Sequence, residues 1–298
     1  MPHSPQRFWL HLLLFLLTLL TTTVIGARLA ENFDANRPAI YLAEDLVAYQ
    51  RLLSRPEAWL AGLAYSLTLL AILLAHEMGH YLTCRRYGLD ATLPYFIPFP
   101  SVIGTLGAFI RIRSPIYYRR VLFDVGIAGP LAGFAVVVPA AVYGIWSSKV
   151  VPGISAQADL QFGTPLFFRI LQGLLMPGAS PADIALHPVA QAAWVGVFAT
   201  ALNLLPIGQL DGGHILYAVF PARHRLLSRL FLVLLVPLGL IYPPWLVWAA
   251  ILLLLGARHP LVYDFSELDR RRKKLAILAL GLLLLSFMVA PIETRWGD

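Results

Sequence analysis

The sequence has very little cysteine and few charged residues, and each shortage excludes a class of protein. Its single cysteine, Cys84, cannot form an intrachain disulfide, and we interpret it as a buried, inert thiol rather than a metal ligand. Only 13% of the residues are charged and 58% are hydrophobic, with a mean hydropathy of +0.71. These values are typical of a polytopic membrane protein embedded in a lipid bilayer.

Acidic residues are fewer than basic ones, which leaves a net charge of +7. The basic residues gather in loops between apolar runs, so membrane topology explains the excess better than nucleic acid does, and we expect no nucleic-acid partner. By the positive-inside rule these loops face the cytoplasm. The clusters are Arg85, Arg86, Arg111, Arg113, Arg119 and Arg120, then Arg223, Arg225 and Arg229, then the run 270–274.

The apolar runs predict an all-α polytopic fold with about six to seven transmembrane helices in a single integral membrane domain, residues 1–298. The first run is longer than the apolar part of a signal peptide, so we interpret it as a retained span. Two short runs joined at Pro243-Pro244 make the number of spans uncertain by one, and residues 230–291 hold the C-terminal transmembrane helices. The runs are 8–26, 59–82, 121–146, 188–205, 230–242, 245–256 and 275–290.

The run 59–82 contains the sequence His76-Glu77-Met78-Gly79-His80. On a helix His76 and His80 share one face, so both imidazoles can bind one zinc ion. Glu77 lies next to them and can reach a water molecule without binding the metal. Charged and imidazole side chains are costly inside a membrane, which favours a functional role over a chance match of the His-Glu-x-x-His pattern.

A second informative stretch, 203–214, interrupts an apolar run with Pro206 and paired glycines. Irregular backbone at membrane depth persists only where it is buried or lines a cavity. Asp211 lies in this break and reaches the same side of the membrane as the two histidines, so it is the predicted third ligand of one Zn2+ per chain. Asn203 is a neutral candidate for stabilising an oxyanion, with helix capping as an equally good alternative.

Two further stretches have less specific predictions. Residues 93–116 are rich in β-branched and aromatic residues and are broken by proline and glycine, which predicts a short membrane-associated β-hairpin between the second and third spans. Its segment Gly104, Thr105, Leu106 and Gly107 could bind an extended substrate as an added strand, or the hairpin could only anchor the chain to the membrane surface. Gly126, Gly129 and Gly133 in the run 121–146 predict close helix packing.

These motifs resemble the site-2 protease family, peptidase family M50, over roughly Tyr65 to Phe220. In such intramembrane zinc metalloproteases the first motif gives two ligands and the catalytic glutamate, and the Asp-Gly motif gives the third ligand. The family's asparagine matches Asn203, and residues 104–113 resemble the hairpin of short members, including plastid ones. The likeness is to a short form without a PDZ domain, with a catalytic core at about 59–220.

The resemblance implies a metalloendopeptidase that cleaves membrane-spanning protein substrates in regulated intramembrane proteolysis. We expect a multi-pass protein of a bacterial inner membrane, or of a plastid membrane, with the active site toward the cytoplasmic side. The sequence predicts neither the substrate nor the oligomeric state. In this mechanism Glu77 is the general base, and Asn203 is the candidate second catalytic residue, as a hydrogen-bond donor to the oxyanion.

Three other interpretations use the same residues. A membrane metal carrier or sensor would need no role for Glu77, and the internal repeats common in transporters are not visible. A cytosol-facing membrane-anchored zinc protease would need a helical glutamate after His80 as third ligand, and Glu267 lies in a basic loop. An inactive relative serving as a scaffold is disfavoured by the complete set of motifs.

Overall fold

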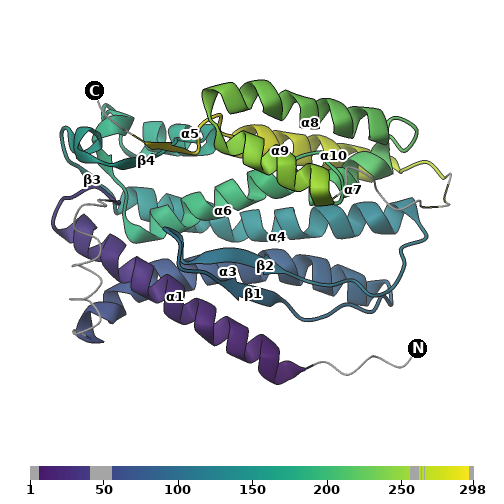
Figure 1. Ribbon diagram of the computed structural model, residues 1–298, viewed down its shortest axis with the longest axis horizontal. Coiled ribbons are helices and arrows are strands. Elements are labelled where there is room, and N and C mark those ends of the chain that lie inside the picture. The colour runs from purple at the N-terminus through teal and green to yellow at the C-terminus, as the bar shows by residue number, and fades with distance from the viewer. Residues whose placement is uncertain (1–6, 41–55, 256–261, 263, 265, 295–298) are drawn as a thin grey trace.

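The computed structural model describes residues 7–40, 56–255, 262, 264 and 266–294. This part of the chain is mostly helical, and most of the long helices run roughly along the longest axis of the molecule (Figure 1). The helices are α1 (Phe8–Asp34), α3 (Pro56–Arg86), α4 (Arg119–Trp146), α5 (Leu166–Leu175), α6 (Pro188–Leu204), α7 (Asp211–Val219), α8 (His224–Ile241), α9 (Pro244–Leu255) and α10 (Arg270–Ser286).

Four of the described helices, α1, α3, α4 and α8, are long and apolar enough to cross a membrane. The other apolar runs form shorter helices. The structure therefore has four helices of full spanning length among its described residues, where the sequence predicted six to seven crossings. Helix α6 is short because Leu205 and Pro206 end it, and most of its residues are buried inside the bundle. A helix that is apolar on all sides is typical of a buried position in a bundle.

Helix α1 extends beyond the expected end of the first run, residue 26, to Asp34. The added turns carry Arg28, whose side chain is buried and pairs with Glu31 one turn later at 3.1 Å. This pairing of opposite charges at i and i+3 lets polar residues continue a helix. The helix ends where Asn36 adopts a left-handed conformation, with φ of 53°.

The main core lies between α1, α3, α4 and α6, and α4 packs against both α3 and α6. Helices α1 and α3 meet at Gly26 and Gly62, where an added Cβ on Gly62 would lie 2.2 Å from the Thr23 carbonyl oxygen. Such close approach requires glycine, as in small-residue packing between membrane helices. Helices α8 and α9 pack on each other and form a separate cluster with Leu205, Ile207 and Leu283 of α10.

The predicted hairpin is present between α3 and α4 as an antiparallel pair, β1 (Tyr95–Pro98) and β2 (Thr105–Phe109). In Figure 1 it lies against the helices between α1 and α4. Tyr65 on α3 donates a hydrogen bond to the Ile103 carbonyl at 3.0 Å, and Thr21 on α1 donates one to the Gly104 carbonyl at 2.7 Å. The turn of the hairpin is therefore fixed to two helices of the bundle.

At the opposite end of the molecule from α7, the connection between α4 and α6 folds over the helix ends (Figure 1). Two short antiparallel pairs shape this region, β3 (Lys149–Val150) with β5 (Ile184–Ala185), and β4 (Leu160–Phe162) with β6 (Ile292–Thr294). The second pair brings the C-terminal part of the described chain against the α4–α6 connection. Besides these strands, the connection contains α5 and two 3-10 helices, η1 (Ile154–Gln157) and η2 (Pro181–Asp183).

Candidate metal centre

Two helices bring the predicted ligands together. Helix α3 carries His76 and His80 on one face, and Asp211 is the first residue of α7. Helix α7 begins next to the end of α6 because Gly212 and Gly213 lack side chains. A Cβ on Gly212 would lie 2.0 Å from the Leu204 carbonyl oxygen. The paired glycines therefore allow the break between α6 and α7 that places Asp211 against α3.

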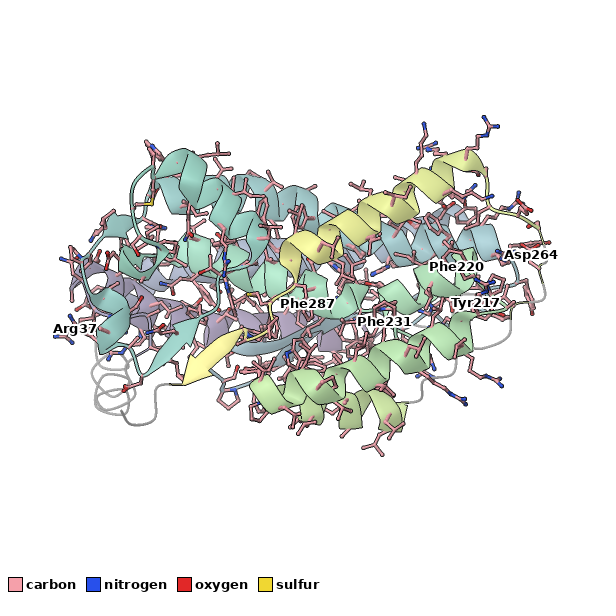
Figure 2. The ribbon with its side chains drawn as sticks, turned by 90° about the horizontal axis from the view of Figure 1, so that it is seen from above. Arg37, Tyr217, Phe220, Phe231, Asp264 and Phe287 are labelled. Atoms are coloured by element: carbon pink, nitrogen blue, oxygen red, sulfur yellow. The ribbon has the colours of Figure 1, made fainter. Side chains whose placement is uncertain are left out.

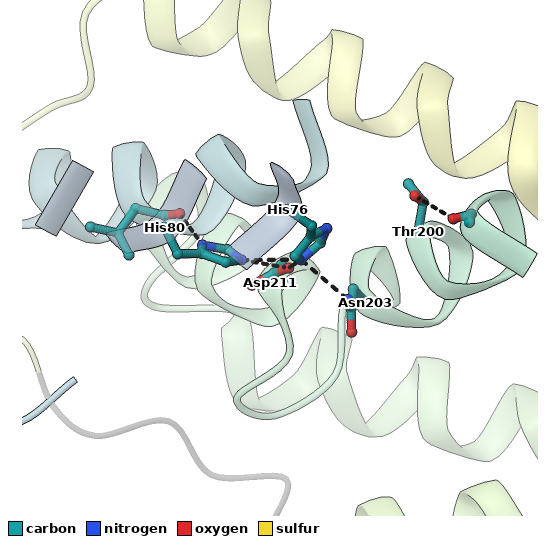
Figure 3. Close-up of polar contacts among 7 residues, drawn as sticks. His76, His80, Thr200, Asn203 and Asp211 are labelled. Atoms are coloured by element: carbon teal, nitrogen blue, oxygen red, sulfur yellow. Dashed lines mark hydrogen bonds and ion pairs between the residues drawn. The ribbon is translucent and has the colours of Figure 1, made fainter. Parts of the chain in front are cut away.

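The three side chains meet at one point (Figure 3). His76 Nε2 and His80 Nε2 are 3.2 Å apart. Asp211 Oδ2 lies 3.2 Å from His76 Nε2 and 3.3 Å from His80 Nε2. Among the residues that the structure describes, these three form a group of potential ligand atoms that could hold a metal ion.

The separations fit a tetrahedral ion. Nitrogen and oxygen ligands about 2.0–2.1 Å from a tetrahedral zinc ion lie about 3.3–3.4 Å from one another. The three measured separations agree with that edge length to within about 0.2 Å. Two imidazoles and one carboxylate are three protein ligands, which leaves a fourth position for water or substrate, as in catalytic zinc sites.

The His80 ring is oriented by the backbone of α4. Its Nδ1 lies 2.7 Å from the carbonyl oxygen of Val125, so Nδ1 carries the proton and donates it, and Nε2 is left unprotonated for a metal. Figure 3 shows this contact on the side of His80 away from Asp211. A hydrogen bond to the non-ligating nitrogen is a regular feature of histidine ligands.

Glycines on α4 make room for both rings. An added Cβ on Gly129 would lie 2.1 Å from His80 Nε2, and one on Gly133 would lie 3.1 Å from the Cβ of His76. A Cβ on Gly126 would meet His214 of α7 at 3.0 Å. The glycines expected to serve helix packing thus also border the candidate metal centre.

A cavity of about 160 Å³ borders His76. Glu77, which is 7% exposed, and Asn203 both line it, and the Asn203 amide nitrogen lies 3.3 Å from His76 Nε2. The hairpin lines it with Leu106, Gly107 and Ala108. Glu77 also contacts the backbone amide of Ile110, directly after β2. Of the hairpin residues expected to contact substrate, Leu106 and Gly107 line this cavity, whereas Gly104 packs on Thr22 of α1.

Several residues around the site were not predicted from the sequence. Trp248 and Leu252 of α9 line the cavity, although nothing in their apolar run distinguishes them from lipid-facing residues. The Val125 carbonyl is a backbone group, so no side chain reveals it.

Thr105, which was expected to contact substrate, does not line the cavity. Its hydroxyl donates to the Ile97 carbonyl at 2.8 Å within the hairpin.

Comparison with known proteins agrees with these observations. The model of a family described as "Peptidase family M50" matches residues 64–242, which is more than half of the chain. A protein of Oryza sativa subsp. japonica, "Probable zinc metalloprotease EGY1, chloroplastic", is 29% identical over 96% of this chain and 51% of its own length. The Arabidopsis thaliana protein of that name is 30% identical over 76% of this chain and 43% of its own length.

A second Arabidopsis thaliana protein, "Probable zinc metalloprotease EGY2, chloroplastic", is 30% identical over 77% of this chain and 42% of its own length. The chain thus spans about half the length of the curated relatives that it matches. The match over residues 64–242 includes the histidine motif, the hairpin, α4 and the break that carries Asp211. The chain belongs to peptidase family M50, a family of zinc-dependent metalloproteases.

Proposed function

We propose that this protein is an intramembrane zinc metalloendopeptidase that hydrolyses peptide bonds of membrane-spanning substrates. The observation that carries the proposal is the set of three potential ligand atoms at tetrahedral spacing beside a cavity lined by Glu77. Sites of this composition polarise a carbonyl group and activate water. The catalytic core would comprise about residues 59–220.

His76, His80 and Asp211 would hold one zinc ion. When bound, zinc supplies a Lewis acid that favours ionisation of water near neutral pH. Glu77 would take the proton from the attacking water and later deliver it to the leaving amine, as a general base that becomes a general acid. The Asn203 amide would donate a hydrogen bond to the oxyanion, because it lines the cavity beside His76.

The hairpin would present the substrate. Leu106 and Gly107 line the cavity, and an extended peptide added beside β2 would lie next to Glu77. Unwinding a substrate helix into an extended strand exposes its backbone to the catalytic groups. The alternative is that the hairpin only anchors the chain to the membrane surface. An anchor would not need hairpin residues in the wall of the cavity.

We infer six to seven membrane crossings, with α6, α9 and α10 completing the bundle beside the four long helices. Arginines gather at the C-terminal end of α3 and the N-terminal ends of α4 and α10. His80 lies in the last two turns of α3, at that same end. By the positive-inside rule the site would face the cytoplasm of a bacterial cell, or the corresponding side of a plastid membrane. The second possibility is included because the names of the relatives describe them as chloroplastic.

A membrane metal carrier or sensor that uses the same ligands is the alternative, and the position of Glu77 argues against it. A carrier has no use for a buried carboxylate that lines the cavity beside the ligands. The test is cleavage of a membrane-helix substrate by wild type and by Glu77→Gln in detergent. Cleavage only by wild type, with zinc in both, supports the protease; equal cleavage by both proteins would contradict it.

A further inference from the structure

A second cavity, of about 300 Å³, lies at the opposite end of the molecule from α7 and outside the residues that surround the histidines. Its walls come from the end of α1, the connection between α4 and α6, helix α5 and the start of α6. In Figure 2, Arg37, one of the lining residues, lies at the far left, whereas Tyr217 of α7 lies at the right. The volume is at the lower end of the range for small-ligand sites.

Two buried glutamines line this cavity. Gln172 of α5 is 6% exposed and Gln191 of α6 is 3% exposed. The side-chain carbonyl oxygens of both accept no hydrogen bond from any residue that the structure describes. The orientation of Gln191 is fixed, because its amide nitrogen donates to the Leu186 carbonyl at 2.7 Å. Buried acceptors of this kind require a donor from a ligand or from water.

The same cavity has a positively charged wall. Arg169 of α5 and Arg37 both line it. The Nε of Arg169 donates to the Thr164 carbonyl at 3.2 Å, which fixes the guanidinium next to the cavity. Within the described ranges, no carboxylate pairs with Arg169. The fork of two terminal N–H groups is the geometry that binds a carboxylate in a bidentate manner.

A ligand for this site must carry a carboxylate for Arg169 and N–H donors for the glutamine oxygens. The C-terminal end of a peptide chain has both within one or two residues, since the terminal carboxylate follows directly on backbone amides. We propose that this cavity binds the free C-terminus of a peptide segment. The polar groups named above match the end of a peptide backbone, so the site would recognise a chain end, and apolar lining residues such as Ile154 and Phe162 would accept apolar side chains of that peptide.

Binding of a peptide C-terminus does not depend on the proposed function. The further statement that this peptide belongs to the substrate rests on the proposed function. Helix α6 connects the two sites, since Gln191 lines this cavity and Asn203 lines the one beside the histidines. They lie roughly 18 Å apart along the helix axis, given a rise of about 1.5 Å per residue. A substrate whose C-terminus is held here would be cut at a fixed distance from its end.

Binding can be measured without catalysis. The protein is the full chain with Glu77→Gln in detergent, and the probe is a fluorescein-labelled alanine–leucine–alanine tripeptide with a free C-terminus, followed by fluorescence anisotropy. Expected results are saturable binding, a loss of at least about tenfold in affinity for the C-terminal amide, and a similar loss for Arg169→Gln. Arg169→Lys should fall between, because it keeps the charge and loses the fork.

The matched control is Arg223→Gln, which removes an exposed arginine at the other end of the molecule and should bind like the parent. Equal binding of the acid and the amide would overturn the proposal, and so would tight binding of free alanine or unchanged binding by a folded Arg169→Gln variant. Thermal unfolding of each variant shows whether it is folded. Because no step requires hydrolysis, failure here leaves the protease assignment untouched, and an inactive protein that binds the probe leaves this inference standing.

Discussion

His76 Nε2 lies 3.2 Å from Asp211 Oδ2, although 135 positions separate the two residues in the sequence. The contact joins α3 to the start of α7, and α4 packs against both helices. The site therefore depends on how closely α4 approaches the two histidines. The close approach of α4 requires glycine at the positions that face the two histidines.

Gly129→Ala should abolish zinc binding. The added Cβ would lie 2.1 Å from His80 Nε2, the atom that would bind the metal, so the ring has to move out of position. The matched control is Gly281→Ala on α10, where an added Cβ meets nothing within 4 Å. Zinc content after dialysis checks both variants, and a full complement of zinc in Gly129→Ala would show that the ring adjusts without losing its role.

Asp211→Asn should lower zinc affinity by at least about tenfold, because a neutral amide replaces the only anionic ligand of the set. Competition with a chelator of known affinity measures the change. Glu267→Gln serves as control, since this exposed carboxylate pairs with Lys273 at the surface, at 3.2 Å. Equal zinc affinity in Asp211→Asn and wild type would remove Asp211 from the ligand set.

Acidification should weaken the start of α6. His187 caps this helix by accepting a hydrogen bond from the Val189 amide at 3.2 Å, which requires a neutral Nδ1. Burial lowers the pKa of His187 below its ordinary value, and Lys149 lowers it further, whereas Asp34 opposes the shift. Because the unfolded state then binds the proton more tightly, this contribution is complete above about pH 6.5 and is lost as the pH falls through the folded-state pKa.

His187→Asn tests that prediction, because asparagine caps helices well and does not titrate. Thermal unfolding between pH 5 and pH 8 should show a smaller acid-induced fall of the midpoint in His187→Asn than in wild type. Parallel curves for the two proteins would show that other groups account for the acid sensitivity.

Arg272→Gln should destabilise the protein by about 1.5–3 kcal/mol, the usual range for hydrogen bonds to charged groups. Arg272 lies at the start of α10 and binds Asp124 of α4 through two nitrogens, at 2.8 and 2.5 Å. Asp124 also accepts from the Tyr87 hydroxyl at 2.5 Å, so the contact connects α10 and α4 with the end of α3. The carboxylates of Asp124 and, to a smaller extent, Asp269 raise the pKa of Arg272 further above its ordinary value.

The neighbouring variant Lys273→Gln is the control for Arg272→Gln. Lys273 is more than half exposed and pairs with an exposed glutamate, so its loss should change stability by less than about 1 kcal/mol. Chemical unfolding in detergent measures both. Equal effects of the two substitutions would mean that the contact to Asp124 adds nothing to a surface charge pair.

The helices and three side chains of the site could be predicted from the sequence, because each depends on a local signal. Apolar runs predict helices whatever they pack against, and His76 and His80 share a face through helical periodicity alone. Asp211 was predictable as an acidic residue in a helix break that the alternation of apolar runs puts on the same side as the histidines. The hairpin was predictable from proline, glycine and β-branched residues.

The rest of the site depends on packing between distant segments, which leaves no local signal. In the sequence, Gly129 resembles any other small residue on a membrane helix. Its contact with His80 is visible only when α3 and α4 are packed together. The Val125 carbonyl and the α9 residues Trp248 and Leu252 enter the site through tertiary arrangement. The extension of α1 past residue 26 depends on the burial of Arg28, a charged residue that follows the end of the predicted apolar run.

Zinc content measured beside cleavage of a membrane-helix substrate, for wild type and Glu77→Gln, tests the central claim most directly. Glu77 lines the cavity but lies outside the group of potential ligand atoms, so the substitution should leave zinc binding intact and remove the general base. The account predicts about one zinc per chain in both proteins and cleavage by wild type alone. Cleavage by Glu77→Gln at the wild-type rate would contradict it.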